Sequence, residues 1–320
     1  MSRLLRSLLL IAIVFASPLV HSPGHANAAA RSDVRVQIFY DDLAPYGRWV
    51  DHRIYGVVWV PGGVPRDWGP YTDGAWVWTA DYGWYWDSYE PYGWATYHYG
   101  RWVLTSDYGW VWVPDDVWGP AWVDWRYGGG YVGWSPMPPE SRWHNGAMVY
   151  ARADMSAPEY EPRWVFVSDS NFARGEIRAQ RMPPSENRAR LSASTRATSY
   201  TSVNGRVFNG GVDVKQLSAA TKIKIATRTT AVVDTPGVAT AGAKGSVSIF
   251  RPNIAARQKL DLTVPQPNAD LPWQTDAGAS VRQNTDIDTG APVSGSVGAA
   301  ARSNTGIERP ELPGISGGAV

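Results

Sequence analysis

The sequence predicts an all-β fold of consecutive antiparallel β-hairpin repeats, followed by a disordered C-terminal tail. Three observations predict it. A Trp/Tyr-rich unit recurs between residues 46 and 114, its apolar runs are too short and too often broken by glycine for helices, and residues 256–320 contain few aromatic residues. The pattern leaves open whether the hairpins form a small barrel, a propeller-like array or a stacked meander, because it fixes only local pairing.

Residues 1–28 have the pattern of a secretory signal peptide. Two arginines precede an apolar stretch, and Ala26-Asn27-Ala28 is a small-x-small cleavage site. Ser17-Pro18 interrupts the apolar stretch, which makes it short for a membrane span, although an uncleaved anchor is the alternative. We therefore expect cleavage after Ala28, a periplasmic or secreted protein, and no transmembrane segment in the mature chain.

The aromatic repeat occupies residues 38–140. Its three units begin at Tyr46, Asp73 and Tyr99, which are 27 and 26 residues apart. Each unit contains two tryptophans ten residues apart, which are the pairs Trp49/Trp59, Trp76/Trp86 and Trp102/Trp112. Trp, Tyr and Val favour strands, and turns with Asp and Gly separate the runs, so each unit predicts a hairpin. A partial fourth unit follows over residues 121–134.

Both faces of each predicted hairpin are apolar. Alternation along a strand places Trp76, Trp78, Trp84 and Trp86 on one face and Val77 with Tyr85 on the other. Such a hairpin is either covered on both sides or leaves an aromatic face open to a partner. We expect most of the tryptophans to form a core. At the edges of the Trp face, the binding residues we predict are Trp78, Trp84 and Trp110.

Residues 141–255 predict a weaker, partly ordered region that contains β-strands and a linker. The expected strands cover residues 147–150, 164–167, 222–225 and 246–250, and a helical turn is expected over residues 172–181. Residues 185–200 are polar and rich in arginine, which indicates a linker. Residues 256–320 predict a disordered tail, because they cannot bury enough apolar surface to offset chain entropy.

Several strings in the repeat resemble a known family. They are Phe39 to Trp49, Ser88 to Ala95, Tyr97 to Trp102, Trp118 to Val123, and Gly133 to Pro136. The pattern Tyr-Asp-x-Leu-x-Pro-Tyr-Gly-x-Trp followed by aromatic hairpins is similar to that of DUF6600, a bacterial family of exported proteins of unknown function. The resemblance covers residues 38–140. It implies a compartment and a fold, but no activity and no catalytic residues.

The candidate chemistry is sparse. The chain has no cysteine, which excludes disulfides and Cys-based metal sites, and its few histidines lack metal-ligand spacing, so we expect no metal and no cofactor. Asp81 and Asp107 occupy equivalent turns, which turn geometry explains more simply than catalysis. His98 is expected to be a packed, hydrogen-bonded side chain.

The charges are segregated along the sequence. Residues 41–140 contain thirteen Asp and Glu but five Arg, whereas residues 174–206 contain seven Arg and two Glu. The arginines are able to contact an anionic partner, but a solvated linker is the simpler interpretation, and we expect no nucleic-acid partner because the chain is predicted to be exported.

These observations predict a non-enzymatic exported envelope protein. It is a structural or binding module that uses an aromatic β-surface for a cell-envelope glycan or an envelope protein. The first alternative is a carbohydrate-active hydrolase, which needs two carboxylates from the acidic module in one cleft, with Asp81, Glu90, Asp107 and Asp124 as candidates. The second alternative is a scaffolding surface protein.

Overall fold

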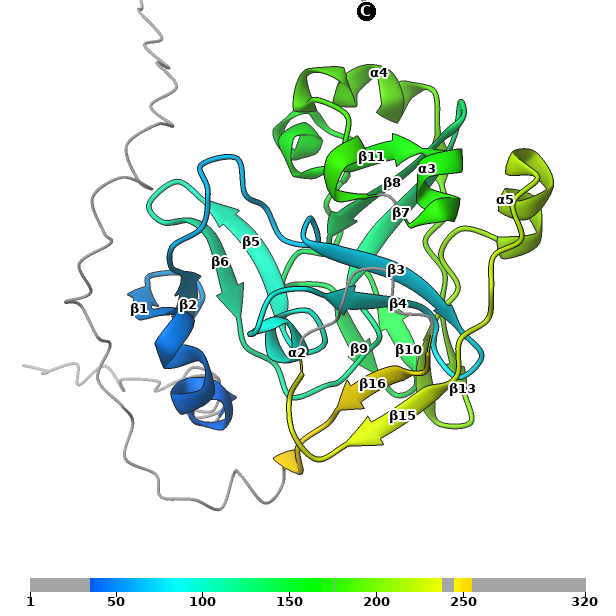
Figure 1. Cartoon of the computed structure of the whole chain (residues 1–320). Helices are drawn as coiled ribbons and strands as arrows, with labels where there is room; N and C mark the ends of the chain where they lie inside the picture. Colours follow the sequence, from blue (N-terminus) through cyan, green and yellow to red (C-terminus); the bar gives the residue numbers. More distant parts are fainter. Residues whose placement is uncertain (1–34, 176, 238–244, 255–320) are drawn as a thin grey trace, which may run out of the picture. The chain divides into compact units, whose positions relative to one another are not determined.

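The computed structural model describes residues 35–175, 177–237 and 245–254 (Figure 1). The predicted signal peptide, its cleavage site and the predicted disordered tail lie outside these residues. Within them the protein is mostly β, as predicted, and no helix is long and apolar enough to cross a membrane.

Four consecutive hairpins form the aromatic module, where the sequence predicted three hairpins and a partial fourth unit. The strands are β1 (Gly47–His52) with β2 (Gly56–Pro61), β3 (Gly74–Thr79) with β4 (Gly83–Ser88), β5 (Arg101–Thr105) with β6 (Gly109–Val113), and β7 (Val123–Gly128) with β8 (Tyr131–Pro136). Each of the three pairs of tryptophans ten residues apart is directly cross-strand. The fourth hairpin pairs Trp125 with Trp134 in the same way. The repeat spacing is therefore the spacing of cross-strand partners around one hairpin turn.

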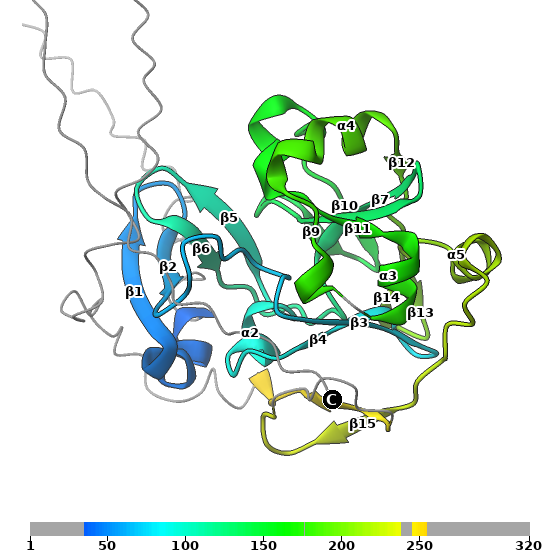
Figure 2. The same ribbon diagram turned by 45° about the horizontal axis from the view of Figure 1, so that its top comes forward.

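The hairpins do not follow one another in a single sheet. The first and third share a four-stranded sheet of order β1-β2-β6-β5, in which Trp59 lies opposite Trp112. The second and fourth hairpins lie in two other four-stranded sheets, β13-β14-β4-β3 and β11-β8-β7-β12 (Figures 1 and 2). The described residues form no closed barrel, so the barrel alternative is wrong. The hairpins are also divided among three separate sheets, so they do not form one stacked meander.

Short helices flank the hairpins. Residues 35–43 are helical, and their buried face carries Val36, Phe39 and Leu43. A 3-10 turn, η1 (Ala44–Tyr46), leads into the first hairpin, and α2 (Gly93–Thr96) connects the second hairpin to the third. The indole N–H of Trp59 donates to the Leu43 carbonyl at 3.1 Å, which ties the leading helix to the module.

The region after the module is more ordered than the sequence predicts. It contains β9 (Arg142–His144), β10 (Ala147–Val149), η2 (Pro158–Arg163), β11 (Val165–Ser168), α3 (Asp169–Arg174), η3 (Arg178–Gln180), η4 (Pro184–Glu186), α4 (Asn187–Ser192), β12 (Thr195–Arg196), β13 (Tyr200–Val203), β14 (Arg206–Asn209), α5 (Val214–Thr221), β15 (Thr230–Val233) and β16 (Val247–Phe250). The strands expected over residues 147–150, 164–167 and 246–250 are confirmed as β10, β11 and β16.

Two predictions for this region are wrong. Residues 185–200 are not a linker, because α4 buries Leu191 and Asn187, whose side-chain amide donates to the carbonyls of Glu161 and Trp164. Residues 222–225 are not a strand, since Lys222 takes a left-handed conformation at the end of α5 and no neighbouring strand pairs with this segment. In both cases the partner that decides the structure is distant in sequence.

The core is built mainly from indole rings. Of the seventeen tryptophans in the described residues, thirteen are buried, and only Trp68, Trp78, Trp110 and Trp143 are half-buried. The Trp faces of the hairpins join one large cluster, whereas the opposite face of the first and third hairpins forms a separate valine cluster. Both faces of these hairpins are thus covered, and most of the repeat tryptophans are core residues.

Asn209 connects the second and fourth hairpins. Its side chain is fully buried, its amide donates to the Trp84 carbonyl at 3.0 Å, and its side-chain oxygen accepts from the Trp125 indole at 2.9 Å. Its backbone N–H donates to the Tyr82 carbonyl at 2.9 Å, where β14 meets β4. This contact brings the chain close to the turn of the second hairpin.

The turn glycines Gly83 and Gly109 provide a matched test of that contact. Both have φ near +70°, but a Cβ at Gly83 would lie 2.1 Å from the Asn209 carbonyl oxygen, whereas at Gly109 nothing lies within 4 Å. We expect Gly109→Ala to lower the free energy of unfolding by about 1 kcal/mol, from backbone strain alone. Gly83→Ala should lose about 3 kcal/mol, because overpacking adds to the strain. Equal losses in urea titration would show that β14 does not pack against this turn.

Candidate functional site

The structure separates the three predicted binding tryptophans. Trp84 is only 2 % exposed, and its indole N–H donates to the Val212 carbonyl at 2.9 Å. The expectation that it lies at an open edge is wrong, because β14 and the loop after it cover this end of the second hairpin. Trp78 is half-buried, with its ring edge-on to Trp84 and to Phe208 at 5.4 and 5.8 Å.

Trp110 lies in a hollow of the surface that we call the aromatic groove. The groove has a cavity volume of about 330 Å³. Three parts of the chain line it, namely the segment between the first two hairpins, strand β6, and residues 162–184. Its lining residues are Asp67, Trp68, Gly69, Pro70, Thr72, Trp110, Pro162, Arg163, Trp164, Val165, Arg178, Arg181, Met182, Pro183 and Pro184. Trp68 and Trp110 are half-buried and thus present ring surface to the cavity.

Glu90 holds Trp68 in place. The Trp68 indole N–H donates to Glu90 Oε1 at 2.7 Å, and the hydroxyls of Tyr92 and Tyr97 donate to the same carboxyl group. Burial raises the pKa of Glu90, although these hydrogen bonds lower it in part. The Trp68 ring also packs edge-on against the buried Trp102 ring at 5.3 Å. Trp68 is therefore a fixed wall of the groove, and a fixed contact surface loses less side-chain entropy on binding a ligand.

Arginines surround the apolar part of the groove. Arg178 forms an ion pair with Asp73 at 3.3 Å. The Nε–H of Arg181 donates to the Arg178 carbonyl at 3.4 Å. The Arg163 guanidinium lies over the Tyr160 ring at 4.5 Å. Within the described part of the chain, neither Arg163 nor Arg181 has a carboxylate partner within 4.0 Å. The groove thus combines indole and proline surfaces with cationic hydrogen-bond donors.

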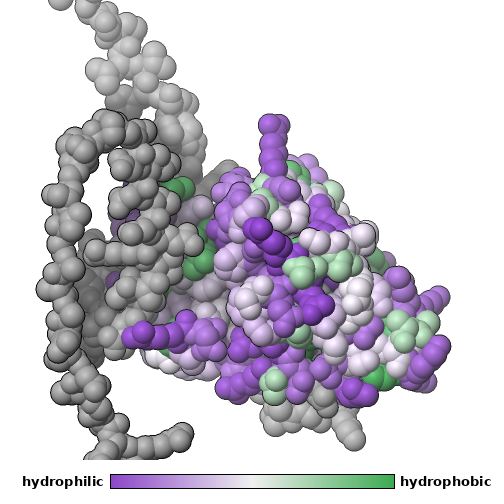
Figure 3. All heavy atoms as spheres, turned by 90° about the horizontal axis from the view of Figure 1, so that it is seen from above, coloured by the Kyte–Doolittle hydropathy of each residue, from purple (hydrophilic) through white to green (hydrophobic). Residues whose placement is uncertain are grey.

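The face of the molecule drawn in Figure 3 has no large apolar patch. On the face drawn in Figure 3, hydrophilic residues predominate and hydrophobic residues form small, separate patches. The large apolar residues that are exposed lie apart in the sequence, and they are Tyr46, Ile54, Val149, Val203 and Val232. The aromatic character of the sequence therefore reaches the surface at restricted places, of which the aromatic groove is one.

The four carboxylates considered for hydrolysis lie in separate surroundings. Asp81 contacts Arg206 and Thr230, and Asp107 lies in an exposed turn beside Ser106. Glu90 is buried under Trp68, and Asp124 is paired with Arg196 on another sheet. No two of them have a hydrogen-bond partner in common among these contacts.

His98 is a structural residue of the core. Its ring is stacked between Tyr85 and Trp118 at 4.6 and 5.7 Å, and its Nδ1–H donates to the Gly119 carbonyl at 3.0 Å. The expectation of a packed, hydrogen-bonded histidine is confirmed. Within residues 35–175, 177–237 and 245–254, no three His, Asp or Glu side chains are grouped as a metal site requires.

The sequence identified Trp110 but not the rest of the groove. Trp68 stands in a Trp-Gly-Pro segment that indicates only a connection between hairpins, and its role depends on Glu90, which is 22 residues away. Arg178 and Arg181 belong to the arginine-rich stretch that suggested an anionic partner. The signal for the cationic rim was thus present, but its placement beside Trp110 depends on the tertiary fold.

Comparison with known proteins identifies the module and nothing more specific. No curated protein and no solved structure matches the chain. Residues 40–141, which begin in the leading helix and extend past the fourth hairpin, match a family described as a family of unknown function (DUF6600). The aromatic hairpin module of this chain is thus similar to the DUF6600 family.

Proposed function

We propose that this chain is a non-enzymatic exported envelope protein whose aromatic module binds a glycan in the aromatic groove. The observation that carries the proposal is the pairing of two partly exposed indoles, Trp68 and Trp110, in one groove of about 330 Å³. Export is supported by the signal-peptide pattern of residues 1–28.

A sugar ring suits this groove for physical reasons. Its C–H faces pack on indole rings, while its hydroxyls need donors and acceptors at the edge. Trp68 and Trp110 supply the ring surfaces, and Arg163, Arg181 and Asp67 supply polar groups at the cavity wall. A groove with a rigid aromatic wall favours binding through contact area. Binding of this kind requires no catalytic residue.

The same observations give less support to the two alternatives, a protein partner and a hydrolase. A protein partner would use a broader apolar patch, and the face in Figure 3 offers only small ones. Hydrolysis needs a carboxylic acid that keeps its proton near neutral pH beside a second carboxylate. Glu90 has a raised pKa, but its carboxyl group is taken up by Trp68, Tyr92 and Tyr97.

Substitution of Trp110 tests the proposal. We expect Trp110→Ala to weaken retention on peptidoglycan or on lipopolysaccharide polysaccharide about tenfold or more, because the ligand loses the burial of one indole face. The matched control is Trp78→Ala, which removes another half-buried tryptophan that does not line the groove. Binding by the two variants is measured by pull-down and by isothermal titration calorimetry. Equal binding by wild type and Trp110→Ala, or no binding by wild type to either material, contradicts the proposal.

A further inference from the structure

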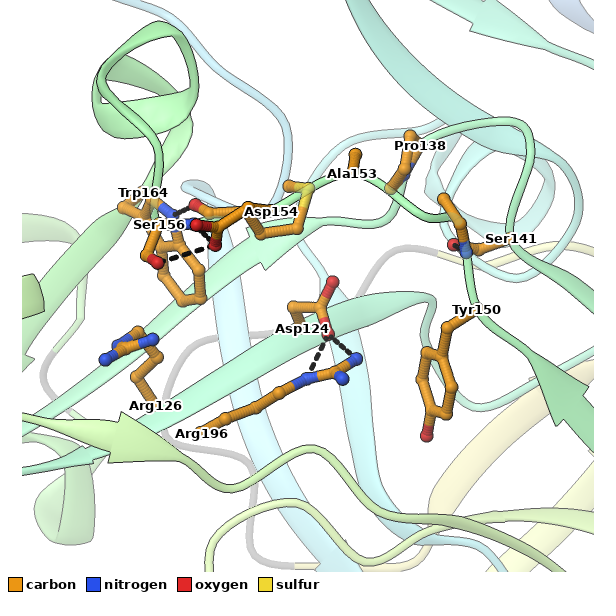
Figure 4. Close-up of a pocket in the computed structure, with 12 residues that line it drawn as sticks. Asp124, Arg126, Pro138, Ser141, Tyr150, Ala153, Asp154, Ser156, Trp164 and Arg196 are labelled. Carbon is orange, nitrogen blue, oxygen red and sulfur yellow. Dashed lines mark hydrogen bonds and ion pairs between the residues drawn. The ribbon is translucent and has the colours of Figure 1, made fainter.

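A second cavity lies beside the aromatic groove, and we call it the charged pocket. Its volume is about 110 Å³, a third of that of the groove. Strand β7 contributes Asp124 and Arg126, β12 contributes Arg196, and the segment after β10 contributes Tyr150 and Asp154. Figure 4 shows Asp124 between Asp154 above and Arg196 below, with the Trp164 ring at the side toward Arg126.

The Asp124 carboxylate is held through one oxygen. Its Oδ1 accepts from Arg196 Nε at 3.2 Å, from Arg196 Nη2 at 2.7 Å and from Thr198 Oγ1 at 2.9 Å. The side chain is 4 % exposed, so this geometry is fixed by its surroundings. In Figure 4 the second oxygen points away from Arg196 toward the Asp154 side of the pocket. An acceptor is therefore available there for a ligand hydroxyl.

Arg126 is a positioned cation whose hydrogen-bond partners among the described residues are all neutral. Its Nε donates to Ser194 Oγ at 3.1 Å, and its Nη2 donates to the carbonyls of Leu191 and Ser194 at 3.0 and 2.5 Å. No carboxylate of the described residues lies within 4.0 Å of it, whereas Arg196 in the same pocket is paired. Three hydrogen bonds, to Leu191 in the last turn of α4 and to Ser194 just after it, thus fix a guanidinium that has no carboxylate in direct contact, although Asp154 and Asp124 attract its charge from farther away. A partly buried cation of this kind favours an anionic ligand group.

Trp164 lines both the charged pocket and the aromatic groove. Its side chain is 4 % exposed, and its indole N–H donates to the Met155 carbonyl at 2.7 Å, so it forms a fixed partition. The two cavities therefore share one lining residue. We take a ligand of more than one sugar residue to span them.

We propose that the charged pocket is a second subsite, which takes the carboxylate-bearing residue of an acidic glycan whose neighbouring residue lies in the aromatic groove. The ligand carboxylate accepts from Arg126, and a ring hydroxyl donates to the free oxygen of Asp124. At about 110 Å³ the pocket is smaller than a cavity of about 150 Å³ that holds benzene, so it takes the carboxylate group and the adjoining edge of the sugar residue, not the whole ring. This inference rests on the proposed function, because it needs a glycan in the groove.

Matched acid and ester ligands test the inference. Isothermal titration calorimetry with the mature full-length chain uses tetragalacturonate and the disaccharide N-acetylglucosaminyl-N-acetylmuramic acid, each beside its methyl ester. We expect wild type to bind at least one acid about tenfold more tightly than its ester, as a charge-assisted hydrogen bond contributes. Arg126→Gln should bind acid and ester equally, and Arg126→Lys should keep part of the preference. Trp110→Ala should weaken both ligands by the same factor.

The outcomes separate the two proposals. If acid and ester bind wild type equally, or if Arg126→Gln keeps the preference, the second subsite is contradicted while the glycan-binding function stands. If wild type binds none of the four ligands, the glycan-binding function fails and the subsite falls with it. Thermal unfolding of Arg126→Gln and Arg126→Lys checks that both are folded, and the lysine variant carries the test if the glutamine variant is not.

Discussion

Replacing Trp125 by alanine should lower the free energy of unfolding by about 4 kcal/mol, the range for removing a large aromatic residue from a packed core. Trp125 is fully buried, and its ring lies 4.4 Å from that of Trp76 and 5.9 Å from that of Phe172. The variant also removes the indole N–H that donates to Asn209 Oδ1, which leaves a buried acceptor unpaired. Guanidinium titration followed by circular dichroism measures the loss.

The control for this variant is Trp110→Ala. Trp110 is half-buried, and the described residues provide no hydrogen-bond partner for its indole N–H, so the expected loss is about 1 kcal/mol. A Trp125→Ala variant as stable as Trp110→Ala would mean that the second and fourth hairpins do not share a core. This comparison tests the packing independently of any ligand.

His98 should make the protein less stable in acid. Burial, together with the nearby Arg251, lowers the pKa of His98 from 6.5 to about 4, although the hydrogen bond to the Gly119 carbonyl opposes this shift. Between these two pH values the unfolded chain binds one more proton than the folded chain, so stability falls as the pH falls. The contribution is complete above about pH 6.5. The loss by pH 4 is about 3 kcal/mol.

Asp87 works in the opposite direction. Burial raises its pKa to about 6, so below that pH the folded chain binds the additional proton and stability rises on acidification. The two groups offset each other in the wild type, and the variants separate them. The stability advantage of wild type over His98→Gln should shrink by about 3 kcal/mol from pH 7 to pH 4, whereas Asp87→Asn should gain on wild type as the pH rises. A wild-type advantage over His98→Gln that is constant with pH contradicts a buried neutral imidazole.

Local patterns predicted the hairpins because a hairpin is a local structure. The ten-residue Trp spacing follows from two strands and their turn, so Trp49 with Trp59 and Trp102 with Trp112 were correctly paired. The sheet partners were not predictable, since nothing near Trp59 specifies that β2 pairs with β6. The same limit explains the wrong prediction for Trp84. Trp84 and Trp110 hold equivalent positions in their hairpins, but β14 and Val212 cover only Trp84.

The site was predictable only where it coincides with the repeat. Trp110 was identified from its strand, but Trp68 and the residues of the charged pocket required long-range contacts. Arg196 lies 72 residues from Asp124, and Arg126 is positioned by Leu191 and Ser194. Composition alone indicated an arginine-rich stretch and an acidic module. Their meeting in one pocket depends on β12 pairing with β7, which a two-residue strand does not signal.

The central claim is that most of the tryptophans form a closed core, whereas Trp68 and Trp110 line one open groove. Hydroxyl-radical footprinting with and without the acidic glycan tests this division most directly, because it reports the accessibility of each indole. We expect Trp68, Trp78 and Trp110 to be oxidised in the free protein and Trp84, Trp112 and Trp125 to be protected. Ligand should protect Trp68 and Trp110 and leave Trp78 unchanged. Oxidation of Trp84 at the rate of Trp110, or ligand protection at Trp78 in place of Trp110, would contradict the account.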